Sequence, residues 1–183
     1  MKNLILIIAS LLFAMTATGQ KYITKNGYIR FFSETPLEKI EAHNRSVNAA
    51  LDAATGDFVF RVLMKSFTFE KALMQEHFNE NYVESDKYPN ATLLSKVTNI
   101  RDVKTDKEGE YPVTVDGKLT IHGVTKSIKV KGSFTVGKNS LLAKAKFTIY
   151  LPDYKIDIPG AVVNNISKNI EITVEATLNK SDF

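Results

Sequence analysis

The chain has 183 residues, a net charge of +4 and no cysteine. This length fits one domain with a sizeable core, and without cysteine the fold must be stabilised by packing rather than by disulfides. The basic residues are scattered among acidic ones, which excludes the basic stripe of a nucleic-acid-binding protein.

Residues 1–19 have the pattern of an export signal. Lys2 supplies a positive charge, an apolar run extends from Leu4 to Phe13, and small residues follow at 17–19. The run is shorter than the roughly 20 apolar residues that span a bilayer. We therefore expect a signal peptide over residues 1–19, a mature domain over residues 20–183 without a transmembrane segment, and a periplasmic or secreted location. A buried N-terminal helix is the alternative.

Residues 47–64 alternate between apolar and polar side chains, and the sequence DAATGD at 52–57 interrupts them. A period of two is typical of a strand with one buried face, and a turn rich in Asp and Gly is typical of a hairpin. We expect two antiparallel strands here. Their apolar face consists of Val47, Ala49, Leu51, Phe58, Phe60, Val62 and Met64.

Residues 70–83 break this alternation. Leu73, Met74, His77 and Phe78 fall on one stripe at helical spacing. Pro89 follows closely and cannot continue a helix. The spacing predicts a capping α-helix over about residues 70–83.

Residues 113–121, 128–136, 141–151 and 170–178 return to the alternating pattern. Strands that each have one apolar face must close on themselves or stack as two sheets, and short connections favour an antiparallel meander. We predict an all-β fold, an extended antiparallel β-barrel of about eight strands.

Aromatic residues fall on the inward-facing parity of these strands. They are Phe58, Phe60, Phe134 and Phe147. Aromatic walls with few polar groups suit a long apolar ligand, but the same residues could fill a dry core. Periodicity alone therefore leaves both a hollow and a filled barrel open.

Three histidines, His43, His77 and His122, are the candidates for acid–base or metal chemistry near neutral pH. No zinc-ligand spacing, cysteine nucleophile or GxSxG elbow accompanies them. We expect no catalytic residue, no metal and no cofactor. A small hydrolase or isomerase that uses His77 in the pocket, and a dry structural barrel, are the alternative functions.

Four basic residues, Arg30, Arg45, Arg61 and Lys65, could meet a polar headgroup near the mouth of a barrel. Charged side chains are rarely buried without a partner, so a solvated outer face is the favoured interpretation.

Several stretches together resemble the YceI-like family of lipid- or polyisoprenoid-binding barrels. They are IRFFS at 29–33, IEAHN at 40–44, TGDFVF at 55–60, FTF at 67–69, LMQEHF at 73–78, YPNAT at 88–92 and GKLTIHGVTK at 117–126. Their order and spacing match the family across nearly the whole mature chain. One departure is LLS at 93–95, where many relatives carry Phe and then Gly, and this change would reshape the lumen locally.

The resemblance implies a lipocalin-like barrel that is capped by a helix and binds a long isoprenoid or other lipid tail, such as that of a quinone or polyprenyl chain. It implies export and a binding protein rather than an enzyme, with a homodimer as a state to test. The expected ligand-binding residues of the lumen are Phe58, Phe60, Val62, Leu73, Met74, His77, Phe78, Phe134, Phe147 and Ile149.

Overall fold

The computed structural model describes residues 20–181. The predicted signal peptide over residues 1–19 lies outside this range. Within it, no helix is long and apolar enough to cross a membrane. The strands are β1 (Lys21–Glu34), β2 (Lys39–Asp52), β3 (Asp57–Leu63), β4 (Thr68–Phe69), β5 (Asn90–Val97), β6 (Gly109–Ile121), β7 (Val124–Val136), β8 (Ser140–Tyr150) and β9 (Asn169–Ser181).

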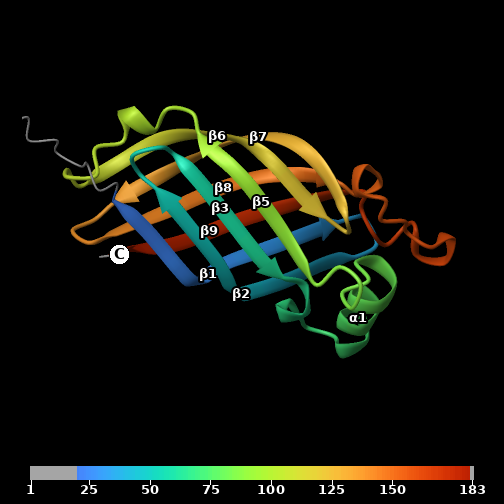
Figure 1. The fold of residues 1–183 in the computed structure, drawn as a ribbon. Coiled ribbons are helices and arrows are strands. Elements are labelled where there is room, and N and C mark those ends of the chain that lie inside the picture. Colours follow the sequence, from blue (N-terminus) through green and yellow to red (C-terminus); the bar gives the residue numbers. More distant parts are fainter. Residues whose placement is uncertain (1–19, 182–183) are drawn as a thin grey trace, which may run out of the picture.

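Eight of these strands close into one antiparallel barrel (Figure 1). Their order around the barrel is β1-β9-β8-β7-β6-β5-β3-β2, and pairing of β1 with β2 completes the circle. Each strand therefore lies beside its neighbour in the sequence, with β9 returning to β1. The two-residue β4 pairs with β2 beyond the end of β3, so it extends the position that β3 occupies beside β2. The predicted barrel is confirmed.

Side chains alternate between the inside and the outside of the barrel. In β3, Phe58, Phe60 and Val62 are 3%, 9% and 7% exposed, while the residues between them face solvent. The alternation is a direct result of the pleat, because successive side chains of a strand point to opposite faces. The period-two pattern of the sequence therefore identified the inner wall correctly.

The predicted helix is present but shorter. The α-helix α1 covers Ala72–His77, and a wider π-helical turn, η2, continues it over Phe78–Tyr82. Lys71 is extended and gives no side-chain cap to the helix. Glu84, with a φ of 44°, turns the chain away. The α-helix and the π-helical turn together cover residues 72–82, so the predicted range 70–83 is slightly too long at both ends.

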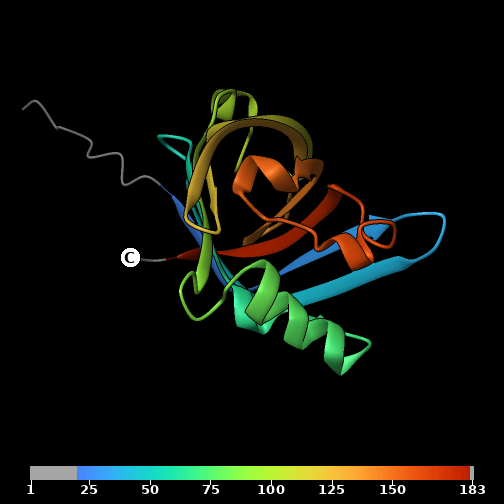
Figure 2. The same ribbon diagram turned by 90° about the vertical axis from the view of Figure 1, so that its right-hand side faces the viewer.

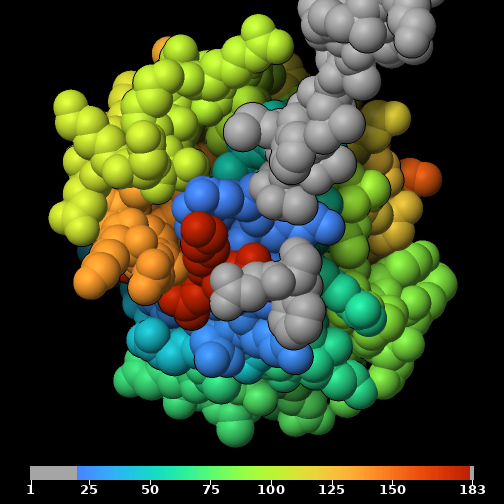
Figure 3. Space-filling view, turned by 60° about the vertical axis from the view of Figure 1, so that its left-hand side comes forward, coloured from blue at the N-terminus to red at the C-terminus, as the bar shows by residue number. Residues whose placement is uncertain are grey.

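The two ends of the barrel are built differently. At one end lie α1, η2 and the long β8–β9 connection with its short helices η4 (Leu151–Tyr154) and η5 (Gly160–Val162). Figure 2 shows this end, with η4 in orange lying across it and α1 in green along one side. We call it the mouth. At the opposite end, which we call the base, the connections 53–56 and 137–139 are tight, and the 98–108 connection (yellow-green in Figure 3) covers one side.

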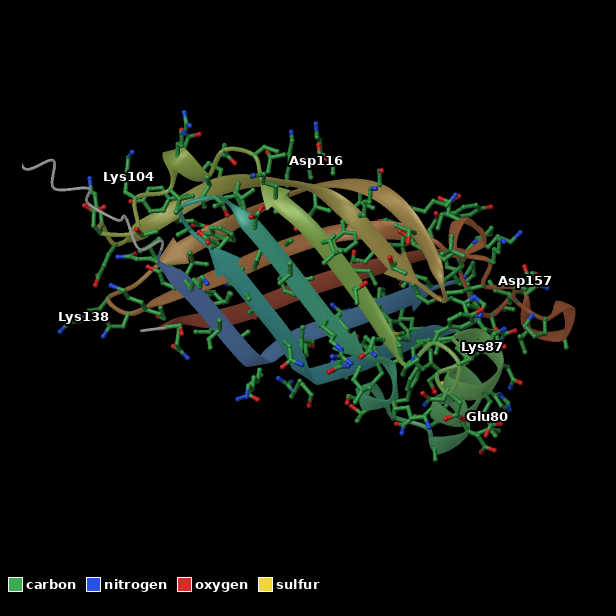
Figure 4. The ribbon with its side chains drawn as sticks, viewed as in Figure 1. Glu80, Lys87, Lys104, Asp116, Lys138 and Asp157 are labelled. Carbon is green, nitrogen blue, oxygen red and sulfur yellow. The ribbon has the colours of Figure 1, made fainter. Side chains whose placement is uncertain are left out.

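Large apolar side chains that are almost completely buried gather toward the base. Leu51 and Val97 lie next to turns at that end, and so do Phe134 and Leu141 on either side of the β7–β8 turn. None of these four is more than 1% exposed. The core is thus filled at the base. Charged side chains labelled in Figure 4, such as Asp116 and Lys138, point outward.

Candidate functional site

A cavity of about 340 Å³ lies inside the barrel and reaches the mouth. Its wall comes from most strands of the barrel, from α1 and η2, and from the β8–β9 connection. Nearly all of the lining side chains are apolar. Pockets of this size and character are typical of small-molecule and lipid sites.

The floor of the cavity is aromatic. The rings of Phe58 and Phe60 have centroids 4.6 Å apart in an edge-to-face arrangement, and Phe58 meets Phe134 edge to face at 5.5 Å. Such contacts stabilise ring pairs beyond the area that they bury. These three rings separate the cavity from the filled core at the base.

A second aromatic cluster lies at the mouth. Phe31 from β1 is within 5.5 Å of Phe67, Phe69 and Phe78, measured between ring centroids. Phe78 in η2 is the ring that joins the helical segment to the barrel. Because all four rings line the cavity, they form both the wall and the support of the helix.

Small residues in the middle of the wall leave the space between these clusters open. Gly132 of β7 pairs with Ala145 of β8, and both line the cavity. Phe147, two residues along β8, is only partly buried although it points inward. Inward side chains that remain partly exposed indicate that the barrel is hollow in this half. The sequence alone could not distinguish a hollow barrel from a filled one.

Nine of the ten residues expected in the lumen line the cavity. The exception is Leu73, which is 61% exposed and does not line it. Met74, His77 and Phe78 line the cavity, although the His77 side chain is also exposed to solvent at the mouth. Leu73 lies about 100° round the helix from Met74, on the outer side. The placement of Leu73 in the lumen was wrong. Ligand contact by the other nine remains a prediction.

Sequence reasoning missed three cavity residues as a group, Phe31, Phe67 and Phe69. Phe31 follows Ile29 on the inward parity of β1, but adjacent Phe32 and Tyr28 gave the opposite parity an equally aromatic pattern. Phe69 belongs to β4, a strand of two residues that is too short to show a period, and Phe67 precedes that strand.

The polar groups of the cavity lie at its rim. The Glu38 carboxylate accepts a hydrogen bond from the Asn165 side chain at 3.1 Å and lies 3.5 Å from the Lys71 ammonium. The buried Ser33 hydroxyl accepts the backbone N–H of Ser167 at 2.9 Å. These contacts tie the β1–β2 turn to α1 and to the β8–β9 connection, so the rim is held by three separate segments.

A second set of polar contacts fixes the other side of the mouth. His122, at the tip of the β6–β7 hairpin, contacts the Glu84 carboxylate at 2.6 Å and the Tyr154 carbonyl oxygen at 3.2 Å through its two ring nitrogens. Tyr88 packs edge to face on the same ring. The hydrogen bond from His122 is the main reason why the pKa of Glu84 lies below its ordinary value. His122 thereby links the segment after η2 to η4.

The three histidines do not come together. His77 lines the cavity, but within residues 20–181 it has no hydrogen bond or ion pair to a carboxylate or hydroxyl. His43 lies on the outer face of β2 between the Tyr28 hydroxyl, 2.8 Å away, and the Glu41 carboxylate. No group of three potential metal ligands gathers among the described residues.

The four basic residues considered for a headgroup lie outside the cavity. Arg30 pairs with Glu41 at 3.0 Å, and Arg61 donates to the Asn90 side chain at 3.0 Å. Arg45 lies over the ring of Tyr28, and Lys65 pairs with Asp86. Their side chains belong to the outer surface, as expected from the sequence, where a solvated outer face was the favoured interpretation.

The sequence and the fold were compared with known proteins. A family model described as the YceI-like domain matches residues 24–178. No curated protein matches the sequence. A polyisoprenoid binding domain from Saccharophagus degradans, implicated in plant cell wall breakdown, is similar in structure with a TM-score of 0.78 at 13% identity, over 89% of this chain and 99% of that one.

Two further solved structures share the fold at low identity. BcnA of Burkholderia cenocepacia has a TM-score of 0.67 at 14% identity, over 83% of this chain and 95% of its own. The YCEI protein of Campylobacter jejuni has a TM-score of 0.58 at 19% identity, over 77% and 85%. Since the family model spans most of the sequence, this chain belongs to the YceI-like domain family.

Proposed function

We propose that this protein is an exported carrier that sequesters the isoprenoid tail of a quinone or polyprenyl lipid inside the barrel, and that it binds this lipid without transforming it. The observation that carries the proposal is the apolar cavity of about 340 Å³ with an aromatic floor and an opening at the mouth. The polyisoprenoid binding domain from Saccharophagus degradans supports the choice of lipid.

The physical chemistry of the cavity favours a tail that is bound by burial alone. Transfer of a CH₂ group from water into an apolar environment is worth about 0.8 kcal/mol, so several isoprene units gain enough to offset the cost of ordering the chain. Few polar contacts are needed. The aromatic walls suit the flat double bonds of an isoprenoid chain.

Export is the part of the proposal that depends on residues 1–19. An apolar run behind a positive charge and small residues at 17–19 support it. A fractionation experiment in the host tests it. The expected result is a mature protein that begins near Gln20 in the exported fraction, and a full-length protein in the cytoplasm would contradict export.

The ligand is tested by purifying the protein from its own host and recording native mass spectra, followed by organic extraction. We expect a co-purifying species whose mass series is spaced by isoprene units. A protein that is empty, and that also takes up neither quinones nor polyprenols when they are added, would refute lipid binding.

A cavity-filling variant tests where the lipid lies. Ala145→Phe places a ring in the middle of the hollow, opposite Gly132, and should abolish lipid uptake while the barrel still folds. Thr148→Phe adds a ring to the outer face of the same strand and serves as the matched control. Equal uptake by both variants, measured by native mass spectrometry, would show that the lipid does not occupy the lumen.

A further inference from the structure

Glu38 occupies a particular place at the rim of the cavity. Among the residues that line the cavity within the described chain, it is the one carboxylate. One of its oxygens accepts from the Asn165 amide at 3.1 Å and the other lies 3.5 Å from the Lys71 ammonium. Its side chain is 25% exposed. A headgroup that leaves the cavity on this side must pass an anion that is held in position.

The one lysine among the lining residues does not offset this charge. Lys144 lies between Ala143 and Ala145 on β8, so its side chain points to the outside, where it is exposed. The cavity thus presents a carboxylate at its rim, with no cationic side chain directed inward from the strands of its wall.

The connections around the mouth extend the same charge. The connections at this end contain eight acidic side chains and five lysines, for a net charge of −3 with the histidines neutral. They are residues 35–38, 64–89, 122–123 and 151–168. The connections at the base, 53–56, 98–108 and 137–139, sum to +1, although the whole chain carries +4. Figure 4 shows Glu80, Asp157 and Lys87 at the mouth and Lys104 and Lys138 at the base.

Three of the five lysines in the mouth connections are paired with carboxylates. Lys71 lies 3.5 Å from Glu38, and Lys87 lies 3.6 Å from Glu84. Lys65 is 2.5 Å from Asp86. A phosphate that approached one of these three lysines would have to break its pair and would leave a carboxylate without its partner. The other two lysines of the mouth connections, Lys155 and Lys168, do not line the cavity.

We propose that Glu38 makes the mouth selective for isoprenoid lipids with an uncharged headgroup, such as a quinone or an alcohol, and rejects those that end in a phosphate. This inference rests on the proposed function, because it assigns the class of headgroup to the same cavity. A phosphate monoester carries a charge of about −1.5 to −2 near neutral pH. Lys71 offsets part of the Glu38 charge, but its side chain is 64% exposed and that of Glu38 is 25% exposed. Water therefore screens the attraction by Lys71 more than the repulsion by the less exposed carboxylate, which lies where the local dielectric is lower.

The test is a competition between two lipids with the same tail, a polyprenol and its polyprenyl phosphate, on delipidated protein. Native mass spectrometry gives the ratio of the two complexes, and gel filtration with radiolabelled lipid repeats it in solution. We expect the alcohol to be preferred by on the order of tenfold at low ionic strength. The preference should shrink as salt is added, since salt screens the charges that remain exposed.

Two substitutions should change this preference in opposite directions. Glu38→Gln keeps an acceptor for Asn165 but removes the charge, so the preference for the alcohol should fall several-fold. Lys71→Gln removes the counter-charge, so the preference should rise. Glu108→Gln, at an exposed acid of the base, is the control and should leave the ratio unchanged. Because each ratio is measured within one variant, a loss of folded protein does not mimic either result.

The outcomes separate the two proposals. If neither lipid binds, the proposed function is wrong. If both bind and the phosphate binds as tightly as the alcohol, or if Glu38→Gln leaves the ratio as it was, lipid binding stands and the selectivity assigned to Glu38 is refuted.

Discussion

The base and the mouth of this barrel are made from the same strands but differ in what fills the space between them. At the base, tight turns bring large apolar side chains together, and Phe134 and Leu141 are almost completely buried. At the mouth, longer connections cover a cavity whose inward residues, such as Phe147 and Ile172, remain partly exposed. The comparison indicates that stability is concentrated where the barrel is filled and that binding capacity is concentrated where it is hollow.

The physical reason lies in what fills the inside. Packed side chains gain dispersion contacts on all sides, whereas a residue beside a cavity lacks partners on one side. A ligand that enters the cavity supplies those missing contacts. The mouth should therefore gain more from lipid than the base, and four predictions test this difference.

The largest expected effect is at the base. Phe134→Ala removes a ring that is 1% exposed and should lower the free energy of unfolding by about 3–5 kcal/mol, measured by urea denaturation of the lipid-free protein. A loss below about 1 kcal/mol would mean that the base is not the filled half of the core.

At the mouth, Phe78→Ala should separate binding from stability. Phe78 is only partly buried, so its loss should lower the free energy of unfolding by about 1–2 kcal/mol, clearly less than Phe134→Ala. Lipid affinity should fall by roughly tenfold, because a ring of the cavity wall and the support of η2 are both lost. The two variants are compared by urea denaturation and by lipid titration. A larger stability loss for Phe78→Ala than for Phe134→Ala would reverse the comparison between the ends.

A smaller effect should depend on pH. The hydrogen bond from His122 lowers the pKa of Glu84 in the folded protein from the ordinary value of 4.5. A lowered pKa means that the contact stabilises the fold above pH 4.5 and that this contribution disappears as the pH falls through the lower value in the folded state.

The measurement for this contact is the difference in urea midpoint between the parent protein and Glu84→Gln. It should be constant near neutral pH and should vanish in acid. Glu110→Gln, on an exposed acid near the base, is the control. If the difference for Glu84→Gln persists unchanged down to pH 2, the carboxylate does not act through its charged form.

The smallest expected effect concerns Leu73. Its side chain is 61% exposed and turned away from the cavity, so Leu73→Ser should change the free energy of unfolding by less than about 0.5 kcal/mol and leave lipid affinity unaltered. A marked loss of lipid binding in titrations would restore Leu73 to the lumen, where the sequence pattern had placed it.

Much of the barrel could be predicted because its signal is local. Phe58, Phe60 and Val62 alternate with exposed residues, and this parity holds in any antiparallel barrel that buries their face. The hairpin at 52–57 was predicted for the same reason, because its turn chemistry is contained in neighbouring residues. The position of the helix could be predicted but its exact ends could not, because its first turn lacks a capping side chain and its last turn widens into η2.

The site was predictable in part. Residues on long strands, such as Phe134 and Ile149, reached the cavity as their parity required. Phe67 and Phe69 did not stand out, because Phe67 precedes β4 and the two residues of that strand cannot show a period. Glu38 gave no signal at all, since its role depends on Asn165 and Lys71, which lie far away in the sequence.

The amino-acid sequence by itself determined which face of each strand is apolar, where the hairpins turn and that one helical segment interrupts the strands. These properties follow from the pleat, from turn chemistry and from helical spacing, and all of them act between near neighbours. Only the tertiary structure decided that the barrel is filled at the base and hollow at the mouth, because that depends on which side chains meet across the lumen. The placement of the Glu38 carboxylate at the rim was decided there too, where the β1–β2 turn meets α1 and the β8–β9 connection.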